Sequence, residues 1–234
     1  SSVREPAALL ASGLAAGASF WPAGPGWLFW FVFVPFFLVI LRKDAAGAFL
    51  HGWFFGIAVW AAGIYWLVEP LSVFLGIPYA AAMAVFSALC AWHGLMFAIL
   101  AAASTAGSRY LSRRLGWREG TALLCTAVPA MAAIENYFPM LFPVYFANTQ
   151  FFHLPLVQIS ELTGPAGLVW LIMGFNIALY GILKAWRGRA TGTETVSGGI
   201  RSSATVFSAA CVLVLLNESY GALFFFSSRR RHTS

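Results

Sequence analysis

Long runs of apolar residues follow one another along this chain of 234 residues, and they constrain its fold more than any other feature. Seven runs approach the roughly 20 residues that a helix needs to cross the hydrocarbon core of a bilayer. Short segments that contain nearly all of the charged residues separate the runs. The predicted spans are residues 7–22, 26–42, 48–68, 80–104, 121–138, 165–186 and 204–220. The sequence therefore predicts an all-α, polytopic transmembrane helix bundle.

The composition agrees with this fold class, because 60% of the residues are hydrophobic and only 9% are charged. A soluble domain carries about 25% charged residues. The formal net charge is +6, but in a membrane protein the positions of basic residues set the orientation in the bilayer. We therefore expect a lipid bilayer and no nucleic acid as partner. Cys90, Cys125 and Cys211 lie far apart in apolar runs without metal-ligand spacing, which indicates buried structural thiols. We expect no metal and no other cofactor.

The lysines and arginines predict the orientation, because the cytoplasmic loops of membrane proteins are enriched in them. With a cytoplasmic N-terminus, the loops on that side contain eleven such residues, and the opposite loops, 23–25, 69–79 and 139–164, contain none. The eleven are Arg4, Arg42, Lys43, Arg109, Arg113, Arg114, Arg118, Lys184, Arg187, Arg189 and Arg201. Seven spans then leave the C-terminus in the periplasm.

Residues 139–164 are apolar enough to form an eighth span, but a further crossing would move Lys184 and the basic residues after it to the other side. Pro139, Pro143 and Pro155 interrupt this segment, and proline breaks a helix interior. We therefore expect a broken segment that lies at the outer interface.

Polar residues near the outer face are the candidates for a functional site. They are Glu135 and Asn136 at the end of the fifth span, Asn148 and Gln150 in the broken segment, and Gln158 and Glu161 before the sixth span. Ionisable groups at membrane depth are costly and are functional candidates by default. Alternatively, these side chains satisfy backbone groups of the broken segment. Both interpretations stay open for the two glutamates, and the second is favoured for the amides.

Glycines at helical spacing predict close packing of the first and third spans. Gly13 and Gly17 lie four residues apart in the first span, and Gly52 and Gly56 lie four apart in the third, with Gly63 one heptad later. Small residues at this spacing let two helices approach closely. This interpretation requires no catalytic role.

Other polar residues inside the spans also have structural interpretations. Asn176 is predicted to form hydrogen bonds across helices, and His51 and His93, which lack a second metal ligand at helical spacing, are predicted to be packed or interfacial. The chain has no G-x-S-x-G, H-E-x-x-H, Walker or dinucleotide-binding motif. The sequence therefore predicts no catalytic residue in this chain.

Three stretches, taken together and in order, carry a family resemblance. The first runs from Phe20-Trp21-Pro22 to Leu41, with Val34-Pro35 inside. The second runs from Gly52-Trp53-Phe54-Phe55-Gly56 to Gly63-Ile64-Tyr65-Trp66. The third contains Glu135, Leu141-Phe142-Pro143, Asn148-Thr149-Gln150, the segment from Pro155 to Pro165, and Asn176. The chain resembles the membrane domain of the apolipoprotein N-acyltransferase family. It departs from the family in having Val144-Tyr145 where a tryptophan usually follows the Phe-Pro pair.

The resemblance implies a reaction in which a phospholipid donates an acyl chain to a cysteine as a thioester. The acyl chain then passes to the α-amine of a diacylglyceryl-modified lipoprotein. It also implies that a nitrilase-like periplasmic domain after the seventh span supplies the Glu, Lys and Cys of the reaction. None of these three is encoded here, so we expect this chain alone to be inactive.

The expected organisation is a transmembrane domain over residues 1–223 in a bacterial inner membrane. Residues 224–234 are expected to be a non-native tail, because they resemble a translated sequencing adapter. A small transporter or channel, and a non-catalytic membrane partner subunit, remain alternatives. A transporter would be favoured by paired intramembrane charges or by broken helices in two corresponding halves.

Overall fold

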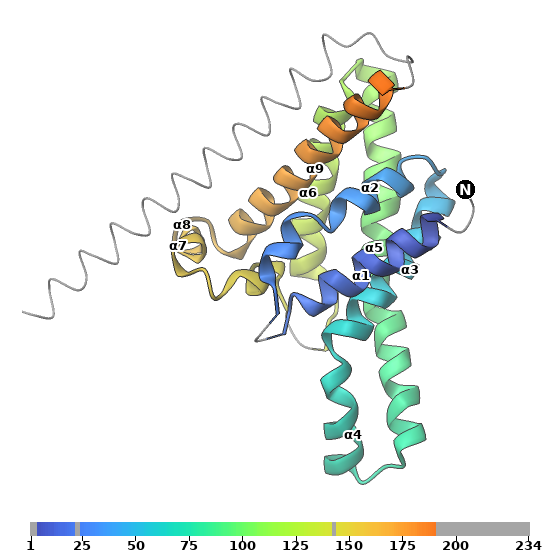
Figure 1. Ribbon diagram of the computed structural model, residues 1–234, viewed down its shortest axis with the longest axis vertical. Coiled ribbons are helices and arrows are strands. Elements are labelled where there is room, and N and C mark those ends of the chain that lie inside the picture. Colours follow the sequence, from blue (N-terminus) through green and yellow to red (C-terminus); the bar gives the residue numbers. More distant parts are fainter. Residues whose placement is uncertain (1–3, 22–23, 142–143, 191–234) are drawn as a thin grey trace, which may run out of the picture.

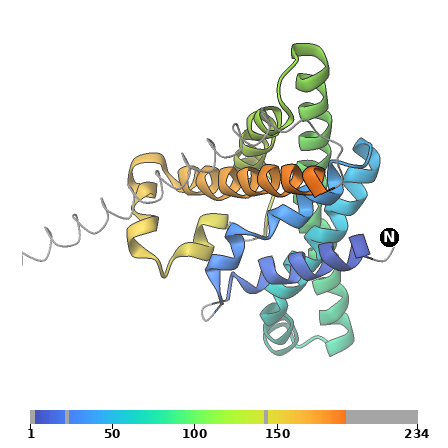
Figure 2. The ribbon, with the colours of Figure 1, turned by 45° about the horizontal axis from the view of Figure 1, so that its top comes forward.

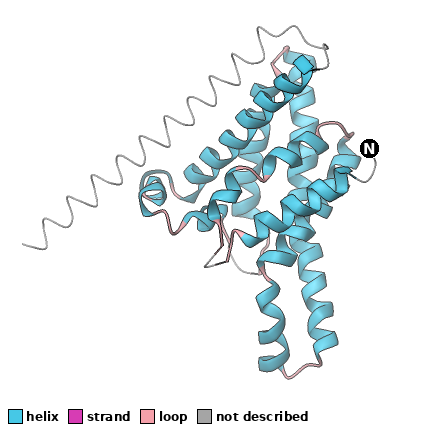
Figure 3. Cartoon of the chain, in the orientation of Figure 1, coloured by secondary structure: helices cyan, strands magenta, loops and turns pink. Residues whose placement is uncertain are grey.

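The computed structural model describes residues 4–21, 24–141 and 144–190, and every regular element in these ranges is a helix (Figure 3). The all-α fold class is therefore confirmed. The elements are α1 (Arg4–Ala18), the 3-10 helix η1 (Gly26–Trp30), α2 (Phe33–Ile40), α3 (Ala45–Gly63), η2 (Tyr65–Leu67), α4 (Val68–Leu75), α5 (Tyr79–Leu115), α6 (Glu119–Tyr137), η3 (Phe146–Gln150), α7 (Leu154–Val157), α8 (Ile159–Thr163) and α9 (Pro165–Ala190). The seventh predicted span, Cys211 and the predicted tail lie outside the described residues.

Within the described residues, three helices are long and apolar enough to cross a bilayer: α3, α5 and the Pro165–Gly188 part of α9. Shorter apolar helical stretches cover Gly26–Ile40 and Tyr65–Leu75. The first and fifth predicted spans correspond to α1 and α6. This set of apolar helices is that of a helical membrane bundle.

The bundle is organised around α3, which packs on α5 and on α1 (Figure 1). The α6 helix joins the bundle through α5 and α9, and α2 lies beside α1, α3 and α9. Rings of Phe33, Phe55 and Phe97, all fully buried, contact one another where these helices meet. A single apolar core therefore links the first helix to the last described one.

The second predicted span, 26–42, is not one continuous helix. It is divided into η1 and α2, with Phe31 and Val32 between them. Side chains satisfy the backbone at this break: Asn176 Oδ1 accepts a hydrogen bond from the Phe33 amide at 3.0 Å, and Ser12 Oγ donates to the Val32 carbonyl at 2.5 Å. A buried break is stable only when its polar groups find such partners. Pro35, the third residue of α2, is a local signal of this break, because proline fits the first turn of a helix but not its interior.

The prediction of a loop over residues 69–79 is wrong, because most of this stretch forms α4. Pro70 is the third residue of α4, and a proline in the first helical turn removes no needed hydrogen bond. Gly76, in the left-handed conformation with a φ of 61°, ends the helix. The α5 helix then runs for 37 residues, about 55 Å, so that α4 and the start of α5 project from the bundle as a hairpin (Figure 1).

The predicted break before the sixth span is confirmed in the described residues. Residues 144–164 form three helices of five, four and five residues, namely η3, α7 and α8. Each is far too short to cross a bilayer. The segment therefore does not add an eighth span.

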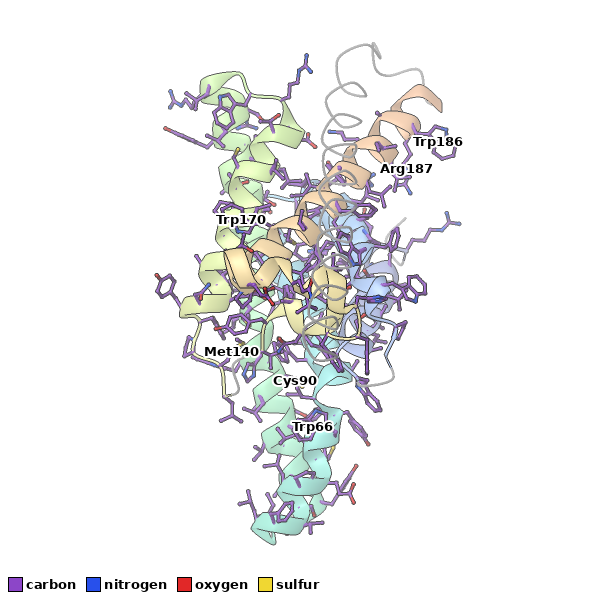
Figure 4. The ribbon with its side chains drawn as sticks, turned by 90° about the vertical axis from the view of Figure 1, so that its left-hand side faces the viewer. Trp66, Cys90, Met140, Trp170, Trp186 and Arg187 are labelled. Atoms are coloured by element: carbon purple, nitrogen blue, oxygen red, sulfur yellow. The ribbon has the colours of Figure 1, made fainter. Side chains whose placement is uncertain are left out.

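Basic residues gather at one end of the bundle. Arg109 Nη2 donates hydrogen bonds to the carbonyls of Leu41 and Lys43 at 3.0 and 2.5 Å, which joins the end of α5 to the turn before α3. Lys184 Nζ lies 2.6 Å from Glu119 Oε2, which joins α9 to the start of α6. Figure 4 shows Arg187 near one end of the molecule and Trp66 toward the other. We call these the basic end and the opposite end.

Candidate functional site

Glu135, in the last turn of α6, is buried at the opposite end, with 4% of its surface exposed. Its Oε1 atom accepts a hydrogen bond from the Phe146 amide at 2.7 Å. Phe146 is the first residue of η3, so its amide has no partner inside that short helix. The glutamate therefore fixes the start of the broken segment to the bundle.

Gln150, at the end of η3, is almost fully buried and uses both ends of its amide. Its Oε1 atom accepts from Trp30 Nε1 at 3.1 Å, and its Nε2 atom donates to the Gly26 carbonyl at 2.8 Å. Nε2 also donates to Thr149 Oγ1 at 2.9 Å. Gln150 thereby ties η3 to both ends of η1.

Asn176, fully buried in α9, completes the set. Besides accepting from Phe33, it donates through Nδ2 to the Phe29 carbonyl at 3.2 Å and to the Ile172 carbonyl at 2.9 Å. We call Glu135, Gln150 and Asn176 the polar anchors. Each bonds a backbone group at an irregular point of the chain, in η1, α2 or η3.

Aromatic rings fill the space between the anchored elements. The ring of Phe146 lies 4.8 Å from that of Phe29 and 5.6 Å from that of Phe97, measured between centroids. Phe20 packs on both Phe29 and Phe146. The broken segment thus rests on a packed aromatic layer, and its position relative to α5 is fixed.

The other four candidate residues are placed differently. Asn136, Asn148 and Glu161 are exposed, and the Asn136 Nδ2 atom donates to the Ala132 carbonyl at 2.8 Å in its own helix. Gln158 is half-buried, and its Oε1 atom is buried with no hydrogen-bond partner, as is Ser160 Oγ. The structure therefore separates the six candidates into buried residues that bond backbone and residues that lie at or near the surface.

Two further residues hold the segment, and the sequence analysis gave them no such role. His93 Nε2 accepts a hydrogen bond from the Leu141 amide at 3.2 Å, while its Nδ1 lies 2.8 Å from the Leu89 carbonyl. Trp92 Nε1 donates to the Pro139 carbonyl at 2.9 Å. The proline-rich break implied that backbone partners were needed nearby, but only the fold shows that α5 supplies them.

The predicted packing glycines lie where helices meet most closely. A Cβ atom on Gly13 would lie 2.7 Å from the Phe55 carbonyl oxygen, and one on Gly56 would lie 2.6 Å from the Gly94 carbonyl oxygen. Cβ atoms on Gly17 and Gly52 would overlap the carbonyl oxygens of Val59 and Phe97. A Cβ on Gly63 would meet nothing nearer than 3.6 Å. The first four glycines line the contacts of α1 with α3 and of α3 with α5.

Glu135 and Asn176 bond backbone groups, and Gln150 bonds a backbone carbonyl and the side chains of Trp30 and Thr149. Within the described ranges, no group of three or more His, Cys, Asp or Glu side chains could hold a metal ion.

Comparison with known proteins decides the family. A family model described as the apolipoprotein N-acyltransferase N-terminal domain matches residues 12–178, which is more than half of the chain. The chain belongs to the apolipoprotein N-acyltransferase family. All three polar anchors and the packing glycines lie within the matched residues.

Named members of the family are longer than this chain. An apolipoprotein N-acyltransferase of Geobacter metallireducens is 30% identical over 214 residues, which cover 90% of this chain and 38% of that protein. Proteins named apolipoprotein N-acyltransferase 2, from two strains of Leptospira interrogans, are 26% identical over 132 residues, or 56% of this chain and 21% of theirs. The chain thus corresponds to the N-terminal, membrane part of such an enzyme.

Proposed function

We propose that this chain is the part of an N-acyltransferase that holds the enzyme in the bacterial inner membrane and brings lipid substrates to a downstream catalytic domain. The donor is a phospholipid, and the acceptor is the N-terminal diacylglyceryl-cysteine of a lipoprotein. A cysteine of the downstream domain carries the acyl chain as a thioester between the two. The chain alone transfers no acyl group.

The observation that carries this proposal is the family match over residues 12–178, which includes the entire anchored segment. Both substrates are lipids held in a bilayer, so catalysis depends on holding the reactive cysteine at headgroup height. A broken segment that is tied to the bundle by Glu135 and Gln150 suits that task. Exposed Asn136, Asn148 and Glu161 are the residues that we propose to lie near lipid headgroups.

The proposed orientation puts the basic end in the cytoplasm and the opposite end in the periplasm. The absence of Lys and Arg from residues 139–164, against eleven in the segments of the other side, supports it. A membrane-impermeant maleimide tests it in intact spheroplasts of cells that express a cysteine-free chain. We expect Asn148→Cys to be labelled and Arg114→Cys to be labelled only after lysis; the reverse pattern would overturn the orientation.

A fusion protein tests the activity. Residues 1–223 would be joined to the part of the Geobacter metallireducens enzyme that follows its matching region, in cells depleted of their own N-acyltransferase. Mass spectrometry of a reporter lipoprotein would then count its acyl chains. We expect the fusion to add the third acyl chain.

Two controls complete this test. The chain without the downstream domain should leave the lipoprotein with two acyl chains, and the complete Geobacter enzyme should restore the third. A fusion that is inserted in the membrane but inactive, beside an active Geobacter enzyme, would contradict the proposal. Acylation by residues 1–234 alone would contradict the assignment of catalysis to the downstream domain.

A further inference from the structure

A cleft with a volume of about 820 Å³ opens at the basic end, between α1, α2 and α9. These three helices run side by side in two views of the molecule (Figure 1 and Figure 2). The volume is within the range of small-molecule sites in proteins, about 300–1,000 Å³. None of the polar anchors is among the described residues that line the cleft, although Asn176 bonds the Phe33 amide, two residues before Pro35 of the lining.

Three arginines from three helical segments are among the described residues that line the cleft. Arg4 begins α1, Arg42 follows the end of α2, and Arg187 lies in the last turns of α9. Figure 4 shows Arg187 at the basic end. The planar guanidinium group forms paired hydrogen bonds to phosphate oxygens, so this set of side chains suits a phosphate better than a metal ion.

One carboxylate, Glu5, also lines the cleft, but another cation neutralises it. Its Oε2 atom accepts a hydrogen bond from Lys43 Nζ at 2.8 Å, whereas Arg42 Nη1 lies 3.8 Å from its Oε1. The hydrogen bond from Lys43 lowers the pKa of Glu5, so this carboxyl stays ionised and paired. Among the described residues that line the cleft, three arginines therefore outnumber this one carboxylate.

The other described residues that line the cleft are apolar. Ala8 lies one turn along α1 from Arg4, and Pro35, Leu38 and Val39 lie on α2. At 1.5 Å per residue, α2 rises about 7.5 Å from Pro35 to Ile40, and Arg42 lies two residues beyond its end. A phospholipid changes from charged headgroup to hydrocarbon over a similar depth. The described lining therefore combines basic groups, which suit a headgroup, with apolar residues, which suit an acyl chain.

We propose that this cleft binds one anionic phospholipid of the cytoplasmic leaflet. Its phosphate lies among Arg4, Arg42 and Arg187, and one acyl chain lies along Ala8, Leu38 and Val39. Basic pockets between membrane helices on the cytoplasmic side favour such headgroups. The lipid joins the first helix to the last described one and acts as a structural ligand. This site lies on the side of the membrane opposite to the proposed acyl transfer, and it does not depend on that chemistry.

Native mass spectrometry of the full chain, released from detergent micelles, tests the site. The probes are dioleoyl phosphatidylglycerol and dioleoyl phosphatidylcholine, which share acyl chains and differ in headgroup charge. We expect one retained phosphatidylglycerol per chain. The double variant Arg42→Gln/Arg187→Gln should weaken its retention on the order of tenfold, because each basic residue contributes to attraction of the headgroup.

A matched control separates a specific site from overall charge. Arg113→Gln/Arg114→Gln removes the same charge from exposed positions in the last turn of α5, outside the cleft. It should retain phosphatidylglycerol like the unmodified chain. Equal losses in both double variants, or equal retention of phosphatidylcholine, would overturn the proposal.

A second variant tests the apolar wall independently. Ala8→Phe would fill the groove without changing charge, and we expect it also to lose the lipid. Displacement of the lipid by millimolar glycerol 3-phosphate would instead indicate a site for soluble anions and would overturn the proposal. Cys90 is buried as predicted, but the prediction of a buried thiol is wrong for Cys125, which is exposed. Each variant is therefore first checked, in a Cys125→Ser/Cys211→Ser background, for a Cys90 thiol that is protected when the bundle is folded.

Discussion

Two apolar regions of the molecule differ in how far they bury their side chains. The first is formed by the contacts of α1 and α5 with α3, which we call the packed seam. The second is the hairpin of α4 with the start of α5. In the packed seam, Phe55 and Phe97 are fully buried, and glycines bring backbones into contact. In the hairpin, Val73, Phe74 and Leu75 are 68%, 85% and 63% exposed. Both regions are apolar in sequence, so hydrophobicity alone does not tell which face a helix buries.

The difference arises from the number of neighbours available to each helix. The α3 helix has neighbours on several sides, whereas α4 has η2 and α5 as its main neighbours. A two-helix hairpin cannot surround its own apolar side chains. Exposed apolar surface of this size is typical of a face that lipid or protein covers. We therefore expect the stability of the described bundle to depend on the packed seam and hardly at all on the hairpin.

The largest expected effect is that of Gly17→Val in the packed seam. Its side chain would overlap the Val59 carbonyl and the Ala62 Cβ, so α1 and α3 would have to move apart. Overpacking of this kind costs about 3 kcal/mol of unfolding free energy. Thermal unfolding in detergent, followed by reaction of Cys90 with a thiol-specific dye in a Cys125→Ser/Cys211→Ser background, measures it.

Gly120→Ala in α6 is the matched control, since a Cβ there meets nothing within 4 Å. It should be neutral or slightly stabilising, because alanine favours a helix more than glycine does. Equal stability of the Gly17→Val and Gly120→Ala proteins would show that the packed seam is not the tight region described above.

The second effect concerns a polar anchor. Glu135→Leu removes the acceptor of the buried Phe146 amide, and an unsatisfied buried group costs about 2 kcal/mol. Glu135→Gln keeps an acceptor oxygen and should recover most of this loss. Limited proteolysis within residues 139–164 should increase in the leucine variant only. A leucine variant as resistant as the glutamine variant would refute the anchoring role.

A third and smaller effect is a pH dependence at the junction of α6 and α9. Burial raises the pKa of Glu119, but hydrogen bonds from Lys184 and Tyr180 outweigh this, and the net pKa lies below the ordinary value of 4.5. The pair therefore stabilises the folded state at pH values above the unfolded pKa. This contribution is lost as the pH falls through the folded pKa.

Because the Glu119 and Lys184 side chains are 43% and 44% exposed, solvent screening limits the contribution to about 0.5 kcal/mol. Glu119→Gln should lower the unfolding temperature at pH 7, and its difference from the unmodified chain should shrink at pH 4, below the ordinary pKa of 4.5. Unfolding scans at both pH values give the comparison. A constant difference across this range would contradict the assignment.

The smallest effect is expected in the hairpin. Phe74→Ser replaces a ring that is 85% exposed, so unfolding of the bundle should change by less than about 0.5 kcal/mol. The same unfolding assay measures it beside Gly17→Val. A loss comparable to that of the packed-seam variant would show that α4 supports the bundle and would remove the contrast between the two regions.

Sequence reasoning predicted the break at residues 139–164 but not the one inside 26–42. Several prolines and a charge count marked the first, whereas the second has Pro35 alone, and the side chains that satisfy it, Ser12 and Asn176, are distant in sequence. The sequence analysis also expected a loop at residues 69–79. A proline such as Pro70 indicates the end of a helix unless it lies in the first turn of the next one. At the break between η1 and α2, local sequence signals do not predict which side chains replace the missing helix hydrogen bonds, because those side chains are distant in sequence.

The sequence by itself determined that the chain is a helical membrane bundle with its basic residues at one end. It could do so because each apolar run and the charges beside it specify a helix and its ends without reference to the rest of the chain. It also marked Glu135, Gln150 and Asn176 as unusual polar residues. Only the tertiary structure decided what they bond, because a buried amide or carboxylate is satisfied by whichever backbone group the packing brings within about 3 Å. The same holds for the arginines of the cleft, which come from three helices and meet only in the fold.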